Sequence, residues 1–69
     1  MLMTGAGTPA RIHYMAGTFR ILASGDYVIC AVTSARIPIH ELRYWSVERQ
    51  EAYVDAQASL EAERRAAKI

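Results

Sequence analysis

Alternation of apolar and polar residues on either side of a short break is the feature that most limits how this chain folds. The apolar members of the pattern are Ile12, Tyr14, Phe19 and Ile21. Because successive side chains on a strand point to opposite faces, the pattern predicts a β-hairpin that starts at Arg11. A two-residue loop pairs Tyr14 with Phe19 and Ile12 with Ile21 on one face, and places the polar residues on the other.

The break at Ala16-Gly17 leaves the type of turn open. A two-residue type I′ turn requires positive φ at both positions, which costs about 1–2 kcal/mol at Ala16. A four-residue loop keeps the same faces and avoids this cost. The pattern therefore predicts the faces of the hairpin and allows either loop length.

The middle of the chain is apolar at six consecutive positions, Tyr27 to Val32, between turn-forming residues 23–26 and 33–35. Such a run is typical of a central strand covered on both faces. Residues 36–39 resume an extended stretch, and Pro38 has no N–H to donate, so this stretch is an edge strand or merely extended. We expect a tight turn at residues 40–42 and extended chain from Arg43 to Trp45.

Two helices are predicted in the last third of the chain. Ser46 is a candidate cap for a two-turn helix over residues 47–53, and Asp55 for an alanine-rich helix from Ala56 to about Ala67. Within the second helix Glu61 has the spacing to pair with the arginines at 64 and 65. Leu60 is its only large apolar residue, so this helix should fray unless a partner covers it.

These elements predict an α+β domain: a small antiparallel sheet of three to four short strands followed by a C-terminal helix. Residues 1–10 are rich in small residues and are expected to form a flexible N-terminal tail. Residues 11–53 form the small β-rich domain, and residues 54–69 contain the C-terminal helix.

Composition narrows the classes of function. The chain has 69 residues, enough for one domain, and its 8 basic and 7 acidic side chains leave a formal charge of +1. So small a charge creates no strong field toward nucleic acid or an anionic membrane. No stretch reaches the roughly 18 apolar residues of a membrane helix, and the first ten residues lack the pattern of a secretory signal. We expect a cytoplasmic protein that does not bind membranes.

The residues that carry chemistry are few and scattered. Cys30 is the only cysteine and lies in an apolar run, so we expect it in the core, with burial raising its pKa. A structural zinc site needs four ligands, usually in close pairs, whereas the candidates Cys30, His13, His40 and Asp26 are dispersed. No catalytic motif is present. We therefore expect no enzyme activity, no catalytic residues, no bound cofactor and no metal.

A segment rich in arginine and aromatic residues is the best candidate for binding. Trp45 is the only tryptophan and is expected to anchor the core. Arginine and tyrosine are frequent in binding hot spots, and the predicted contact residues are Arg43, Tyr44, Arg49 and Tyr53. The leading hypothesis is a non-enzymatic accessory protein that binds another protein or a second copy of itself. The alternative is a small nucleic-acid-binding β domain that uses Arg11, Arg20, Arg36 and Arg43.

Three segments resemble a known family: Cys30-Ala31-Val32-Thr33-Ser34, Ile37-Pro38-Ile39 and the run from Leu42 to Tyr53. The family is a small group of uncharacterised proteins from alphaproteobacteria, known as a domain of unknown function, and the resemblance covers residues 11–53. Its members usually have glycine where Ser34 stands and an acidic residue where Ala16 stands. The resemblance implies a small bacterial cytoplasmic domain and brings no established activity or catalytic residue.

Overall fold

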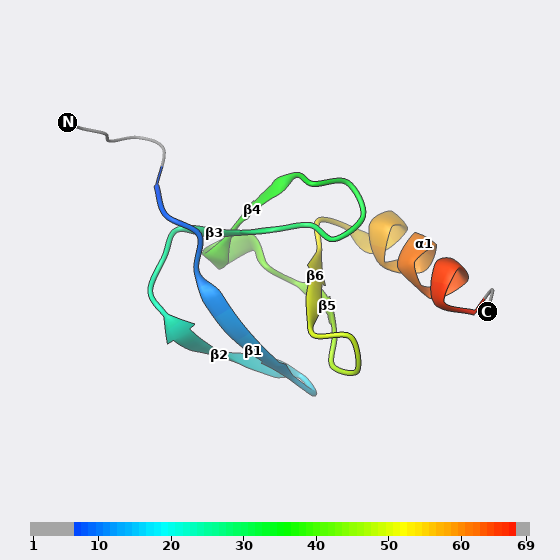
Figure 1. Ribbon diagram of the computed structural model, residues 1–69, viewed down its shortest axis with the longest axis horizontal. Helices are drawn as coiled ribbons and strands as arrows, with labels where there is room; N and C mark the ends of the chain where they lie inside the picture. Colours follow the sequence, from blue (N-terminus) through cyan, green and yellow to red (C-terminus); the bar gives the residue numbers. More distant parts are fainter. Residues whose placement is uncertain (1–6, 68–69) are drawn as a thin grey trace.

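The computed structural model describes residues 7–67, which form six short strands followed by one α-helix (Figure 1). The elements in chain order are β1 (Arg11–Met15), β2 (Thr18–Ala23), β3 (Tyr27–Ile29), β4 (Arg36–Pro38), the 3₁₀ turn η1 (Ile39–Glu41), β5 (Tyr44–Ser46), β6 (Glu51–Tyr53) and α1 (Ala56–Ala66). The predicted α+β class, with short antiparallel strands before a C-terminal helix, is confirmed. Within the described range the strands form three separate pairs, β1–β2, β3–β4 and β5–β6.

The first hairpin has the predicted register. Tyr14 lies opposite Phe19 and Ile12 opposite Ile21, across a two-residue loop at Ala16-Gly17. Only Gly17 has positive φ in this loop, 79°, so the chain avoids the type I′ geometry that would strain Ala16. A bulge follows Ile21, where the pairing shifts by one residue.

The segment before β1 contains the last residues of the tail predicted over residues 1–10. Residues 1–6 lie outside the described residues, but the residues after them are bound to the chain at the start of β3. Ala10 N donates to Tyr27 O at 2.8 Å, and Asp26 N donates to Thr8 O at 2.7 Å. Thr8 N also donates to Asp26 Oδ2 at 3.0 Å. Thr8 and Ala10 are therefore part of the folded domain.

The continuous strand predicted from Tyr27 to Val32 is wrong in its second half. β3 ends at Ile29, whose side chain is 46% exposed, and the chain turns after Cys30. Ser34 N closes this turn by donating to Cys30 O at 3.0 Å, and Ser34 has a φ of 66°. Cys30 N still donates to Ala35 O at 2.8 Å, and Cys30 also forms a parallel bridge to Ala52 of β6.

The helix predicted over residues 47–53 does not form. Residues 47–50 make a turn that leads into β6. Ser46 Oγ accepts a bond from Arg49 N at 3.1 Å, the contact that a helix cap would make. The chain then reverses at Gln50, which has a φ of 53°. Tyr14 N donates to Gln50 Oε1 at 3.0 Å, and Gln50 Nε2 donates to Tyr14 O at 2.8 Å. These tertiary hydrogen bonds favour the hairpin.

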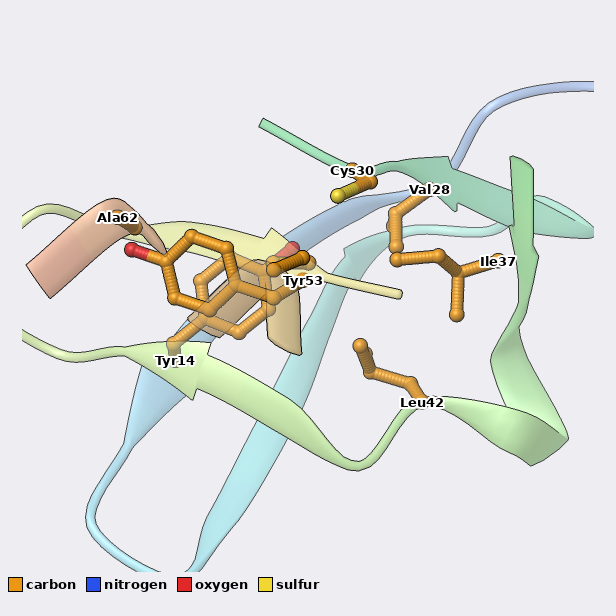
Figure 2. Packing of buried hydrophobic residues seen from close by; sticks show 9 residues of the cluster. Tyr14, Val28, Cys30, Ile37, Leu42, Tyr53 and Ala62 are labelled. Carbon is orange, nitrogen blue, oxygen red and sulfur yellow. The ribbon is translucent and has the colours of Figure 1, made fainter. Parts of the chain in front are cut away.

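The β5–β6 hairpin lies between the first hairpin and α1, as Figure 1 shows. On one side the half-buried Trp45 ring packs 5.5 Å from Phe19 and 6.1 Å from Tyr14, centroid to centroid, and Trp45 Nε1 donates to Met15 O at 2.9 Å. On the other side Tyr53 is directed toward Ala62 of α1 (Figure 2). The buried cluster consists of Tyr14, Val28, Cys30, Ile37, Leu42, Ala52, Tyr53, Ala58 and Ala62.

The C-terminal helix begins as predicted. Asp55 caps it, with Oδ1 accepting a bond from Ala58 N at 2.8 Å. Glu61 pairs with both predicted arginines, at 64 and 65. α1 buries only Ala58 and Ala62 against the domain, whereas Leu60 is 62% exposed. The helix is therefore attached through a small apolar contact.

Candidate functional site

The structure brings together two of the four predicted contact residues, at the turn of the β5–β6 hairpin. Arg49 in the turn bonds the hydroxyl of Tyr53 on β6. Tyr44 is half-buried and lies opposite Tyr53 in the strand register. Arg43 is exposed at the other end of the hairpin, just before β5. The four residues therefore do not form one continuous surface.

Arg49 is the centre of a polar network that connects the hairpin with α1. Its Nε donates to Glu51 Oε2 at 3.3 Å and to the Tyr53 hydroxyl at 3.2 Å. Its Nη2 donates to the Tyr53 hydroxyl at 3.0 Å and to Glu63 Oε2 at 3.0 Å. The Tyr53 hydroxyl donates in turn to Glu51 Oε2 at 2.7 Å. The guanidinium is thus held from three directions.

Tyr53 positions Arg49 and does not itself offer contact area, because only 1% of its surface is exposed. Burial raises the pKa of Tyr53, and its bond to Glu51 raises it further, while the bond from Arg49 opposes this shift. The bonds to Tyr53 and Glu63 raise the pKa of Arg49. Arg49 therefore stays protonated and the Tyr53 hydroxyl keeps its proton at physiological pH.

A cleft of about 240 Å³ lies beside this network. Its lining comes from three parts of the chain: the turn after β3, the β5–β6 hairpin and the last turns of α1. The lining residues are Ala31, Val32, Arg49, Glu51, Ala62, Arg65 and Ala66. The lining thus combines small apolar side chains with two guanidinium groups and one carboxylate.

Of the cleft residues, sequence reasoning had singled out Arg49 for binding. The sequence predicts Arg65 only as the helix partner of Glu61, and Val32 as part of a strand. No periodic or motif signal places these residues beside Arg49, because the cleft depends on how α1 packs against the hairpin. The Arg49–Glu63 pair, which bridges the two elements, is also a tertiary contact.

Cys30 is buried, as predicted, with 1% of its surface exposed, but the predicted direction of its pKa shift is wrong. Burial alone would raise the pKa of Cys30. Hydrogen bonds to the sulfur from Thr33, Val32 and Val54 outweigh burial, and the pKa of Cys30 is lowered. The bond from Thr33 N measures 3.4 Å. The sulfur thus accepts bonds in the turn after β3, which helps to fix this wall of the cleft.

The other candidates from the sequence do not gather into a site. Within residues 7–67 no group of three or more histidine, cysteine or acidic side chains comes together as metal ligands would. The arginines of the nucleic-acid hypothesis are distributed over four places: Arg11 on β1, Arg20 on β2, Arg36 on β4 and Arg43 before β5. The Arg36 guanidinium lies 4.5 Å from the centroid of the Tyr27 ring.

Comparison with known proteins adds a family to this description. A family model described as "Uncharacterized protein conserved in bacteria (DUF2093)" matches residues 21–62, more than half of the chain. The chain belongs to this bacterial family. The resemblance stated from the sequence is confirmed at this level, and the matched range includes the whole β5–β6 hairpin. No curated protein and no solved structure matches the chain. Among the described residues, no helix has the length and apolarity needed to span a membrane.

Proposed function

We propose that this chain is a non-enzymatic accessory protein that binds another protein, and that the cleft between α1 and the β5–β6 hairpin is the binding site. The cleft is the observation that carries the proposal. Its volume of about 240 Å³ is below the roughly 300–1,000 Å³ of pockets that enclose small molecules. A side chain of a partner with its flanking backbone suits this size better than an enclosed substrate does.

The residues around the cleft support the same function. Arginine is enriched among binding hot spots because it combines contact area with several donors. The Arg49 side chain is 29% exposed while Tyr53 and Glu51 hold it, so little rotamer freedom remains to be lost on binding. The single cysteine cannot form an intramolecular disulfide, which is typical of cytoplasmic domains and supports a cytoplasmic location for the complex.

The nucleic-acid alternative has weaker support. A nucleic-acid surface normally concentrates positive charge, whereas the four arginines of that hypothesis come from separate elements and the formal charge is +1. We therefore favour a protein partner.

A matched pair of helix variants tests the proposal. Ala66 lines the cleft, and its neighbour Ala67 is exposed and does not. The tagged protein, expressed at native level in a bacterium that encodes it, is crosslinked and captured as wild type, Ala66→Gln and Ala67→Gln, and the bound proteins are quantified by mass spectrometry. We expect a specific partner whose recovery falls with Ala66→Gln and is unchanged with Ala67→Gln. Equal recovery with both variants, or no specific partner, would refute the proposal.

A further inference from the structure

Two arginines from different elements converge on the cleft. Arg49 comes from the turn of the β5–β6 hairpin, and Arg65 comes from the last turn of α1. Glu51 is the third charged lining residue, so the lining itself carries two positive charges and one negative charge. A guanidinium remains protonated at any physiological pH and presents its donors in a planar fork. The cleft therefore offers two permanent, directional donor groups.

Each of these guanidinium groups has donors left over. In Arg49, Nε and Nη2 are bonded to neighbours, and Nη1 has no hydrogen-bond partner among residues 7–67. In Arg65, Nε donates to Glu61 Oε2 at 3.0 Å, and neither Nη has a partner within the same range. Three terminal nitrogens are therefore available to a ligand without breaking a bond of the folded domain.

We propose that the cleft binds a carboxylate of the partner protein, held between Arg49 and Arg65; this inference rests on the proposed protein-binding function. The two oxygens of a carboxylate match the parallel N–H groups of a guanidinium. The small apolar side chains of Ala31, Val32 and Ala62 provide a surface for the carbon atoms that carry it. The carboxylate comes from an acidic side chain or from the C-terminus of the partner, since both present the same group.

The acidic residues around the cleft remove the electrostatic advantage that phosphate would have over a carboxylate. Glu51 lines the cleft, Glu63 pairs with Arg49, and Glu61 pairs with Arg64 and Arg65, so three carboxylates balance three arginines. Because these opposite charges balance, the second negative charge of phosphate gains little net attraction here, whereas the two oxygens of a carboxylate match the guanidinium fork.

A titration followed by NMR tests this inference with defined probes. The full chain, labelled with ¹⁵N, is titrated with N-acetylglutamate blocked as its α-amide, N-acetylalanine with a free carboxylate, N-acetylglutamine amide and inorganic phosphate. The signals followed are the Nε–H groups of Arg49 and Arg65 and the backbone amides of Ala31 and Val32. Comparison of the two carboxylate probes shows which source of the carboxylate is preferred.

Arg64 supplies the matched control for Arg65. Both arginines are exposed and pair with Glu61, but only Arg65 lines the cleft. We expect at least one carboxylate probe to bind with a Kd on the order of 1 mM, as suits a single exposed ion-paired group. Arg65→Gln should weaken this binding about five- to tenfold and Arg64→Gln less than about twofold.

The outcomes separate this inference from the proposed function. Absence of a saturable shift with both carboxylates, equal effects of Arg65→Gln and Arg64→Gln, or tighter binding of phosphate would overturn the carboxylate site. If the Ala66→Gln comparison still identifies a cleft-dependent partner, the protein-binding function stands without it. If a carboxylate binds as expected but no cleft-dependent partner exists, the binding chemistry is right and the protein-binding function is wrong.

Discussion

The hydroxyl of Tyr53 gives the sharpest test of how the hairpin positions Arg49. Replacement of Tyr53 by phenylalanine keeps the ring in the core and removes one oxygen. That oxygen accepts bonds from Arg49 Nε and Nη2 and donates to Glu51. The variant therefore isolates the polar network from the packing of the ring against Ala62.

The expected loss of stability in Tyr53→Phe follows from these hydrogen bonds. Hydrogen bonds to charged groups contribute about 1.5–3 kcal/mol net. The Arg49 and Glu51 side chains are about one third exposed, so water replaces part of what is lost. We expect Tyr53→Phe to lower the free energy of unfolding by about 1–2 kcal/mol. In a domain of this size that is a fall in Tm of roughly 5–12 °C.

Tyr44 provides the control because it lies directly opposite Tyr53 in the β5–β6 register. None of the described residues hydrogen-bonds its hydroxyl, so Tyr44→Phe should cost less than about 0.5 kcal/mol. Urea unfolding followed by circular dichroism measures both variants against the wild type. If Tyr53→Phe and Tyr44→Phe are equally stable, the hydroxyl network does not hold Arg49 and the reasoning about the site is wrong.

Three further predictions concern the turns and the buried titratable groups. Ser34 and Gln50 both have positive φ, so Ser34→Gly should stabilise the protein by about 0.5–1 kcal/mol. Gln50→Gly should destabilise it, because this change removes the hydrogen bonds to Tyr14. Thermal melts in which both variants shift in the same direction would contradict this. Burial raises the pKa of Tyr14 and Tyr53 above their usual 10.0, so the protonated hydroxyls stabilise the fold below pH 10, and this stability is lost as pH rises through the raised pKa values. Urea unfolding should therefore have a lower midpoint at pH 11 than at pH 8. An unchanged midpoint would count against this prediction. Cys30→Ala should lower the free energy of unfolding by about 1–3 kcal/mol, because it leaves the Thr33 amide without its acceptor. Cys30→Ser should lower it less. Equal losses of stability in chemical denaturation would show that the acceptor is unimportant.

Sequence patterns within a few residues predicted the elements that depend on contacts between near neighbours in the chain. The period of two placed Tyr14 and Phe19 on one face of the first hairpin, and the side chain of Asp55 caps α1 where expected. The same kind of signal failed at Ser46. Its hydroxyl makes the bond of a helix cap, but the chain reverses because the Gln50 amide bonds the edge of β1. A bond between residues 36 positions apart leaves no periodic trace in the sequence.

The residues of the candidate site also divide into those predicted from the sequence and those brought together only by tertiary contacts. Arg49 was predicted as a contact residue from its type alone, and the structure places it at the cleft. Arg65 was missed because it joins Arg49 only when α1 packs through Ala58 and Ala62. The lowered pKa of Cys30 was missed because burial, which raises it, is outweighed by hydrogen bonds from the Thr33 side chain and from the backbone of Thr33, Val32 and Val54. Such donors are created by the fold and are not encoded as a residue pattern.

Photo-crosslinking tests the proposed binding site most directly. A benzoyl-phenylalanine at Val32, which lines the cleft, is compared with one at Ile21, an exposed aliphatic residue on β2 in the first hairpin. Both proteins are irradiated in cells of a bacterium that encodes the chain. We expect a discrete crosslinked protein from position 32, reduced by Arg65→Gln and retained with Arg64→Gln, and none from position 21. A partner crosslinked only from position 21, or equally from both positions, would contradict it.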